Sequence, residues 1–232
     1  MFAIKFQLQD PKQLLKNCPL FAGLPAAELN RLLPCTKPKF CCYRRGELVA
    51  AWGEQIRLGI VAEGVILSTR DMDRRSSHII EFLEQGHLFG VDAVLSCEGT
   101  CPTNLIADVN SSILFFDLLE PVEQAEPELR AHLMSNASRV LADRSVKLLY
   151  RTEVLSVKLL RNQILAFFRI LQRKQGSNTI RLKLNRQQLA QYLCTNRSAL
   201  SRELGWMQRD GLITIHSNRT ITIAPGAIDG GA

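Results

Sequence analysis

The segment 184–223 constrains the fold of this chain most, because it contains two short helical patterns joined by a tight turn. Asn185 can cap the first helix, and Gln188 stands at the position that completes a capping box. Thr195 or Asn196 can cap the second helix. The first helix is therefore expected to brace the second.

An alternating pattern follows these helices. Residues 212–215 and 220–223 alternate apolar and polar side chains around a turn at 217–218, which predicts a β-hairpin. Arg219 would stand at the tip of this hairpin, where it could meet backbone phosphate. Two helices and a hairpin in this order are typical of a winged helix-turn-helix, whose second helix enters the major groove of DNA.

Helical periodicity assigns two faces to the second helix. Leu200, Leu204 and Met207 share the inner face. The outer face would carry Arg197, Ser198, Ser201 and Arg202. Trp206 is expected to pack toward the domain core, because duplex DNA hides the faces of its bases. Gly205 is expected to allow close packing between helices.

Charge is divided unevenly along the 232 residues. Residues 158–232 contain 12 Lys and Arg against 3 Asp and Glu, whereas residues 1–157 contain 17 against 19. The formal net charge of +7 therefore comes from the C-terminal third. A basic module beside a nearly neutral one favours a polyanionic partner at one end, the alternative being a solvated basic face.

The number of cysteines and the N-terminal sequence indicate in which cellular compartment the protein resides. Seven cysteines are an odd number, and the start MFAIKFQLQD shows neither a secretory signal nor an apolar run long enough for a bilayer. We expect a cytoplasmic protein that has reduced thiols and does not associate with a membrane.

The rest of the chain predicts an α+β fold. Residues 11–33 suggest short helices, and residues 40–117 alternate apolar segments with turn signals, as in a small barrel or double-sheet jelly roll. A long helix over 126–150 follows. Its apolar residues recur at intervals of three and four: Leu129, Leu133, Ala137, Val140, Leu141, Val146 and Leu149.

This long helix has two interpretations. It could pack against its own barrel, or it could pair with a second copy of the chain. Pairing is favoured, because a two-fold dimer places two reader helices on half-sites about one turn of DNA apart. The expected organisation is a jelly-roll sensor domain over 1–120, a dimerisation helix over 121–151 and a winged helix-turn-helix over 152–232. Residues 151–156 would form a hinge, and the tail 225–232 would be disordered.

Two motifs carry a resemblance to a known family. The run Gly86-His87-Leu88-Phe89-Gly90 is close to a glycine-rich turn of the Crp/Fnr bacterial transcription regulators, and 196–202, NRSALSR, resembles their reader helix. The resemblance implies a cyclic-nucleotide-binding-like jelly roll, a homodimer on a palindromic operator of double-stranded DNA, and contact with RNA polymerase. It places Arg197, Ser198 and Arg202 on base edges, Ser201 beside them, and Gln187 and Asn196 near phosphates.

Ser198 departs from the family pattern, which often has Glu at this position. Arginine can donate two hydrogen bonds to guanine, a carboxylate accepts from cytosine, and a serine hydroxyl serves several bases. The operator half-site is therefore expected to differ from that of the best-known members.

The resemblance also implies that the jelly roll receives the signal that controls DNA binding. Similar cyclic-AMP receptors carry a glutamate and an arginine–hydroxyl pair where this chain has Val91 and Cys101-Pro102, which argues against cyclic AMP. A small-molecule effector of another kind is the first alternative. Residues that could line its pocket are Arg57, Arg70, His78, His87, Gly90, Val91, Asp92, Cys101, Thr103 and Asn104.

Cysteine chemistry offers a second kind of signal. Cys41, Cys42, Cys97 and Cys101 could form a thiol switch or a metal site if the fold brings them together, although the spacing of an iron–sulfur protein is absent. The alternative is that Cys35, Cys41, Cys97 and Cys194 are small buried apolar residues, the commonest state of a free cysteine in a cytosolic protein. A cupin-type metal enzyme would need a histidine cluster, and His78 and His87 are nine residues apart, so we expect neither catalysis nor a metal centre of this histidine type.

Overall fold

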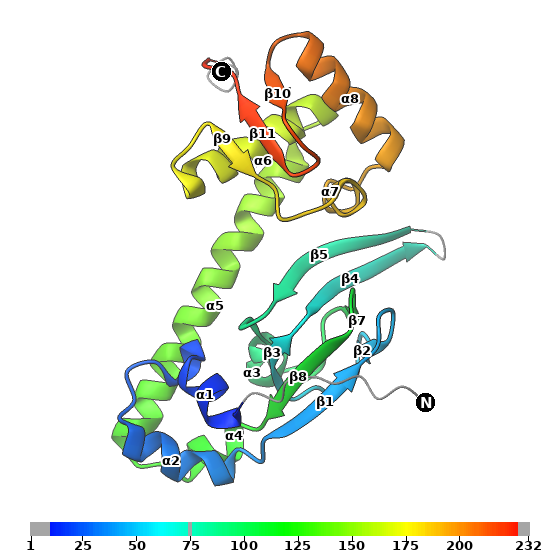
Figure 1. The fold of residues 1–232 in the computed structure, drawn as a ribbon. Coiled ribbons are helices and arrows are strands. Elements are labelled where there is room, and N and C mark those ends of the chain that lie inside the picture. The colour runs from blue at the N-terminus through cyan, green and yellow to red at the C-terminus, as the bar shows by residue number, and fades with distance from the viewer. Residues whose placement is uncertain (1–9, 74–75, 227–232) are drawn as a thin grey trace. The chain divides into compact units, whose positions relative to one another are not determined.

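The computed structural model describes residues 10–73 and 76–226 (Figure 1). The chain divides into two compact units, Met1–Asp71 with Ile80–Arg144, and Met72–Ile79 with Ser145–Ala232. The division falls within one long helix, between Arg144 and Ser145. The mixed α/β architecture, with sheets first, a long helix next and a helix-turn-helix last, is the predicted fold class.

The first unit begins with short helices, as predicted. These are α1 (Pro11–Lys16), the 3-10 helix η1 (Pro19–Phe21) and α2 (Ala26–Cys35). The Asp10 carboxylate accepts a hydrogen bond from the backbone N–H of Lys12 and so caps α1. Leu15 and Leu20 are fully buried against the sheet residue Phe116 and its neighbours.

Two four-stranded antiparallel sheets form the jelly roll. Their strands are β1 (Lys39–Tyr43), β2 (Leu48–Ala50), β3 (Leu58–Glu63), β4 (Val65–Asp73), β5 (Ser76–Glu84), β6 (Leu88–Phe89), β7 (Asn104–Ala107) and β8 (Ser111–Phe116). One sheet has the order β1-β8-β3-β6 and the other β2-β7-β4-β5. Val61, Ile66, Phe89 and Ile113 belong to a buried cluster drawn from both sheets. The short helices α3 (Val91–Leu95) and α4 (Leu119–Glu123) complete this part.

The apolar residues of the long helix α5 (Pro127–Ser156) differ in burial along its length (Figure 1). Leu133 and Ala137 are buried in the apolar core of the first unit, and Val140 and Leu141 pack against it. Val146 and Leu149 are instead 46% and 67% exposed. The N-terminal part of the apolar pattern is therefore used inside the chain, and only the later part is free for a partner. The predicted hinge at 151–156 is wrong, because these residues continue the helix.

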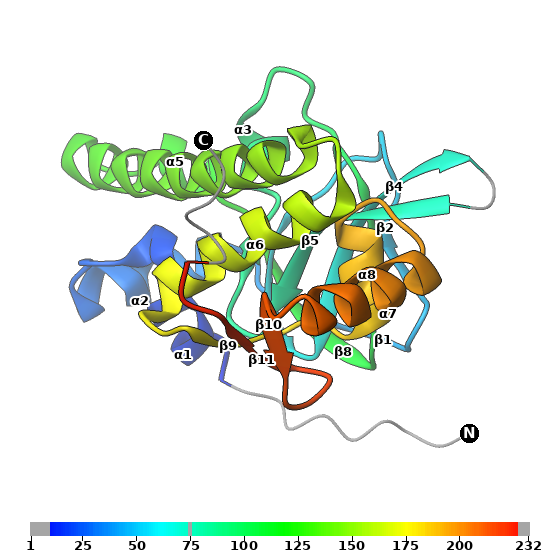
Figure 2. The ribbon, with the colours of Figure 1, turned by 90° about the horizontal axis from the view of Figure 1, so that it is seen from above.

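The second unit is a small helical domain with a three-stranded sheet (Figure 2). Its elements are the end of α5, α6 (Leu160–Gln175), β9 (Thr179–Arg181), α7 (Arg186–Tyr192), α8 (Arg197–Arg209), β10 (Ile213–Ile215) and β11 (Thr220–Ile223), with the sheet order β10-β11-β9. Ile164, Phe168, Leu189, Leu200 and Ile221 are fully buried in this unit. The two helices and the hairpin predicted over 184–223 are confirmed. The predicted disorder of the tail falls mostly on 227–232, outside the described residues.

Candidate nucleic-acid interface

Helix α8 begins at a well-formed cap. Asn196 has an extended backbone, and its side-chain Oδ1 accepts a 2.7 Å hydrogen bond from the backbone N–H of Ala199. The Ser198 hydroxyl donates a second 2.7 Å bond to the same oxygen. Asn196 is therefore the N-cap, one of the two residues predicted for that role. The cap fixes the residue at which the exposed Arg-Ser sequence enters the helix.

The inner side of α8 anchors it to the unit. Leu200, Leu204 and Met207 are buried, as predicted. From α6, Arg161 donates hydrogen bonds of 2.6 Å to Glu203 and 2.7 Å to Asp210. Both carboxylates raise the pKa of Arg161, so the guanidinium stays charged. Apolar contacts and this ion pair together determine which side of α8 faces outward.

The turn before α8 is tight. Asn185 and Gln188 form the predicted capping box at the start of α7. The backbone N–H of Thr195 donates to the carbonyl of Ala190 at 2.9 Å. Cys194 adopts φ of +54°, the left-handed region in which a side chain is disfavoured.

All seven side chains predicted to meet DNA are exposed in the second unit: Gln187, Asn196, Arg197, Ser198, Ser201, Arg202 and Arg219. Ser198 and Arg202 are four residues apart and so share one side of α8. Arg197 and Ser201 lie on the neighbouring flank. The geometry can thus present two guanidinium groups and two hydroxyls to a groove.

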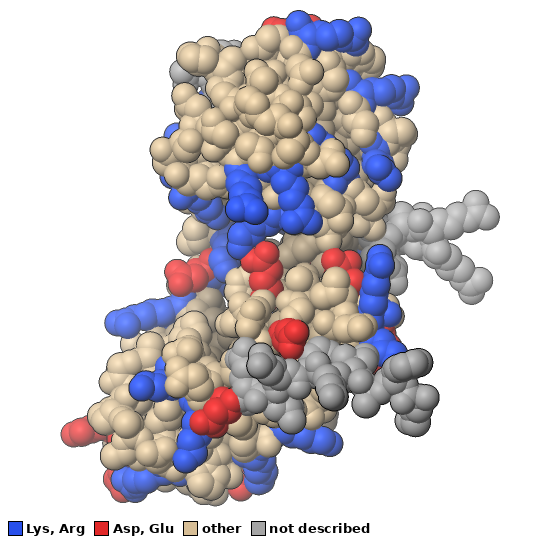
Figure 3. Space-filling model, viewed as in Figure 1, with Lys and Arg blue, Asp and Glu red and all other residues tan. Residues whose placement is uncertain are grey.

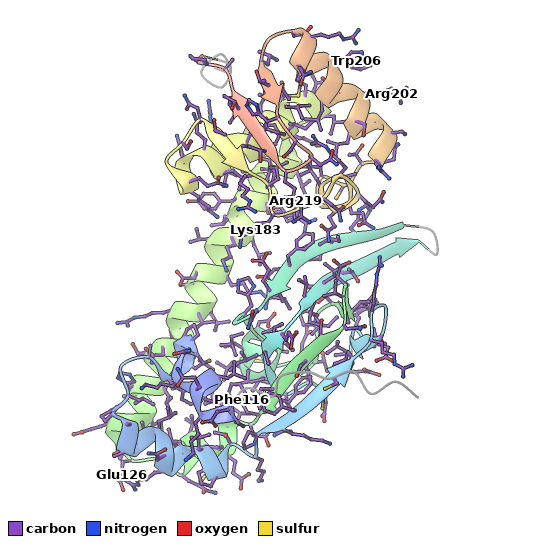
Figure 4. The ribbon with its side chains drawn as sticks, viewed as in Figure 1. Phe116, Glu126, Lys183, Arg202, Trp206 and Arg219 are labelled. Carbon is purple, nitrogen blue, oxygen red and sulfur yellow. The ribbon has the colours of Figure 1, made fainter. Side chains whose placement is uncertain are left out.

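Two expectations for the end of α8 are wrong. Trp206 is 45% exposed instead of packing toward the core, because Met207 occupies the inward position next to it. Gly205 is also exposed, and a Cβ built there would meet no atom within 4 Å, so close packing inside the chain does not require a glycine. Figure 4 shows Arg202 and Trp206 projecting from the outer side of α8.

The hairpin adds cations beside the helices. Arg219 is exposed between β10 and β11, and its carbonyl accepts a 2.7 Å hydrogen bond from the backbone N–H of Leu182. This bond brings the exposed Lys183 close to the hairpin turn (Figure 4). Lys183 was missed in the sequence, because the pairing that places it there joins segments 37 residues apart.

Arg186, the first residue of α7, is a further cation that the sequence did not reveal. Burial lowers the pKa of this half-buried guanidinium. Within the described part of the chain, no group forms a hydrogen bond to its buried Nη1. Figure 3 shows Lys and Arg as the dominant charged side chains on the visible face of the second unit.

In the barrel, the structure brings together some of the predicted pocket residues. The buried Thr103 side chain forms a 2.7 Å hydrogen bond with Ser68, and the thiol of Cys101 donates to the Thr103 carbonyl at 3.0 Å. Burial raises the pKa of the Cys101 thiol, and the negative charge of Asp92 raises it further.

Asp92 also forms an ion pair with Arg144 of α5, with Arg144 Nη1 2.5 Å from Asp92 Oδ1. Arg144 Nε also lies 3.3 Å from Glu81 Oε2 of β5. Arg144 and Glu81 were not among the predicted residues.

The other predicted pocket residues are dispersed. Arg57 pairs with Asp117 at 2.6 Å, Arg70 lies over the ring of the exposed Trp52 at 4.5 Å, and Asn104 accepts from the Trp52 backbone. The other four residues do not gather at one site. The His87 ring accepts a hydrogen bond from the backbone N–H of Glu84, and His78 is half-buried on β5. Gly90 precedes α3 with φ of +87°, and Val91 is buried in the core of the first unit.

The seven cysteines are all free thiols. Burial raises the pKa of the Cys18 thiol to about 12. The expectation that Cys35, Cys41, Cys97 and Cys194 are buried is wrong, because Cys41 is half-buried and the other three are exposed, as is Cys42. Among residues 10–73 and 76–226, no three His, Cys, Asp or Glu side chains are grouped closely enough to hold a metal ion. No helix of this described part has the length and apolarity needed to cross a membrane.

Comparison with known proteins identifies the second unit. Residues 159–224 match the family model of the Crp-like helix-turn-helix domain. No curated protein matches the chain.

Solved structures share the fold of the chain at low sequence identity. The c-di-GMP responsive global regulator CLP of Xanthomonas campestris has a TM-score of 0.67 at 15% identity, covering 86% of this chain and 100% of its own. A mutant of CooA from Carboxydothermus hydrogenoformans has 0.66 at 19%, covering 84% and 85%. A transcriptional regulator of the CRP family from Thermus thermophilus has 0.55 at 17%, covering 82% and 94%. The chain has the fold of these Crp/Fnr-type regulators, and residues 159–224 form a Crp-like helix-turn-helix domain.

Proposed function

We propose that this protein is a bacterial transcription regulator, not an enzyme, that binds a palindromic operator as a homodimer and responds to a signal in its jelly roll. One observation carries the proposal. Helix α8 holds its apolar side in the core and exposes the side that carries Arg197, Ser198, Ser201 and Arg202. This helix lies in the C-terminal third of the chain, which carries nine excess positive charges. An exposed arginine helix within a basic lobe suits the major groove of DNA.

The reader residues have distinct chemical roles in this proposal. Arg197 and Arg202 donate to base edges, and each could form a bidentate pair with a guanine. Ser198 already donates its hydroxyl proton to Asn196, so its oxygen is left to accept from a base amino group. This polarity favours cytosine or adenine opposite Ser198.

Residues around these base-contacting side chains would bind the phosphates of the DNA backbone. Gln187, Asn196 and Arg219, together with the cations Lys183 and Arg186, are exposed or partly exposed in the same unit. Arg186, the first residue of α7, is partly exposed and adds a positive charge to this unit. These contacts supply affinity and orientation without reading sequence.

Dimerisation is assigned to the later part of α5. Ala142, Val146 and Leu149 are exposed and are separated by four and three residues, the spacing of a coiled-coil seam. The seam follows the stretch that packs on the first unit, so one helix can serve both contacts. Contact with RNA polymerase and a cytoplasmic location follow from the same proposed function.

The signal is assigned to the barrel around Asp92, Cys101 and Thr103. Arg144 connects this region to α5, so a ligand that competes for Asp92 or Glu81 would release the helix that carries the dimer seam. Cyclic AMP is not the proposed ligand, because Val91 and Cys101 provide no charged partners for its ribose and phosphate. A thiol switch is the second candidate, carried by the exposed Cys97 near this region of the chain.

A charge substitution in the seam tests the dimer. The double variant Val146→Glu/Leu149→Glu should sediment as a monomer and bind operator DNA more weakly, because like charges would face each other across the two-fold axis. Lys147→Glu, on another side of α5, is the matched control and should remain dimeric. A wild-type protein that sediments as a monomer and binds no duplex at low salt would refute the proposal.

A further inference from the structure

The last turns of α8 expose two residues that contacts within the second unit do not explain. Trp206 exposes 45% of its surface, although tryptophan normally contributes large apolar area to a core. Gly205 stands in the interior of a helix, where glycine is disfavoured relative to alanine, and the space around its missing Cβ is open. Both observations suggest a contact outside the chain.

The helix geometry indicates where that contact lies. Trp206 follows Arg202 by four residues and so projects from the same side as the proposed base-reading residues (Figure 4). It follows Arg197 by nine residues, which is about 13.5 Å along the helix axis. A reader helix places its N-terminal residues on base edges, and the major groove is about 12 Å wide, so a residue this far along the helix would lie beside the sugar–phosphate backbone on the other side of the groove.

We infer that Gly205 and Trp206 form a neutral contact with the sugar–phosphate backbone at the far wall of the major groove. This inference rests on the proposed DNA-binding function and adds a second contact region to it. The indole Nε1–H donates to a phosphate oxygen, and the ring covers the adjacent sugar. Gly205 leaves the space into which the phosphate backbone fits.

Backbone contact suits tryptophan better than base readout at this position. The indole has one donor and no acceptor, so it cannot match the donor–acceptor pattern of a base pair. Its ring cannot stack on bases that remain paired and stacked in a duplex. The contact should therefore raise affinity for all sequences and add no selectivity.

The charge of the contact provides its signature. Tryptophan is neutral, so removing it should weaken binding without changing the dependence of affinity on salt. Removing a phosphate-binding arginine should instead reduce the slope of log K against log salt by about 1. The two kinds of contact can thus be distinguished in one titration series.

The experiment uses the full chain and two duplexes, the selected operator and a scrambled one, each at several salt concentrations. Trp206→Ala should weaken binding to both duplexes by about tenfold, the loss of one hydrogen bond to a charged group, with an unchanged salt slope. Trp206→Phe should fall between this variant and wild type. Trp52→Ala, which removes the other exposed tryptophan from the first unit, is the matched control and should bind like wild type.

Gly205→Ala separates this contact from a structural effect. Alanine should raise the melting temperature, because it favours the helix, and yet lower the affinity for DNA. In addition, the variant Trp52→Phe leaves Trp206 as the sole tryptophan, and its emission should shift to shorter wavelength when duplex is added.

Three results would overturn the inference. Trp206→Ala could bind both duplexes like wild type, which would assign the exposed indole to another partner. The loss could be confined to one sequence, which would indicate base readout. Gly205→Ala could gain stability without losing affinity. If the wild-type protein binds no duplex at all, the proposed function fails as well. If the wild-type protein binds DNA and the Trp206 and Gly205 variants bind it with the same affinity, only this inference is refuted.

Discussion

The guanidinium of Arg161 in α6 donates a 2.6 Å hydrogen bond to the carboxylate of Glu203 in α8. Glu203 stands on a flank of α8, between its buried side and its exposed Arg-Ser side. The ion pair therefore supports the orientation of the helix without occupying its outer face.

Glu203→Ala should lower the free energy of unfolding by about 1 kcal/mol, because the pair is partly exposed and screened by solvent. A double-mutant cycle with Arg161→Ala measures the coupling by chemical denaturation. Asp210→Ala, at the more exposed end of the same guanidinium, should have a smaller effect. Strictly additive losses in Arg161→Ala and Glu203→Ala would show that the ion pair contributes nothing.

Arg202→Ala should abolish the preference for the operator and leave weak, salt-sensitive binding, because the phosphate contacts persist when a base contact is lost. Competition between operator and scrambled duplex in a footprint measures this change. Arg31→Ala, an exposed arginine of α2 in the first unit, is the control. Unchanged selectivity in Arg202→Ala would remove this residue from base readout.

Arg219→Ala should weaken binding to operator and scrambled duplexes by a similar factor, because a hairpin arginine meets phosphate and not bases. The slope of log K against log salt should fall by about 1. Fluorescence anisotropy at four or more salt concentrations provides the measurement. A loss seen only on the operator would indicate that Arg219 reads bases instead.

Cys194→Gly should stabilise the second unit by about 1 kcal/mol, because glycine adopts the left-handed backbone of this turn without steric cost. Cys194→Ala retains the Cβ and should show no such gain, which makes it the matched comparison. Thermal unfolding of both variants decides the point. Equal melting temperatures would show that the turn relaxes to accept a side chain.

Stability should fall as pH rises above 9. Burial raises the pKa of Cys18 from 9.0 to about 12, so the unfolded state loses this proton first and alkaline pH favours unfolding. The contribution of Cys18 should be lost between pH 9 and 12, at a rate that approaches about 1.4 kcal/mol per pH unit. Cys18→Ala should flatten this dependence, leaving a part due to Tyr43, whose pKa burial also raises to about 12. Identical pH profiles for the two proteins would contradict the assignment.

The helix-turn-helix could be predicted because its signals are local. The cap of α7 joins Asn185 to Gln188, and the cap of α8 joins Asn196 to Ala199, so each interaction spans three residues. Helix α6 was missed although Ile164 and Phe168 stand four residues apart on its buried side, a spacing that predicts an amphipathic helix.

For Trp206, helical periodicity predicts exposure correctly, whereas the apolar character of the side chain predicts burial. Its apolar character favours burial, but a position four residues after Arg202 lies on the outer side of the same helix. The ion pairs that Arg144 forms with Asp92 and Glu81 could not be predicted in the same way. Glu81, Asp92 and Arg144 meet from β5, α3 and α5, and only tertiary structure brings such distant segments together.

Selection from a random pool of duplex DNA tests the central claim most directly. The wild-type protein should enrich an inverted repeat whose two half-sites are about one helical turn apart, roughly 10 to 11 base pairs from centre to centre. Arg202→Ala, passed through the same selection, should enrich no defined half-site. If the wild type enriched no sequence, or enriched a single unrepeated site, the account of a dimeric reader built on α8 would be contradicted.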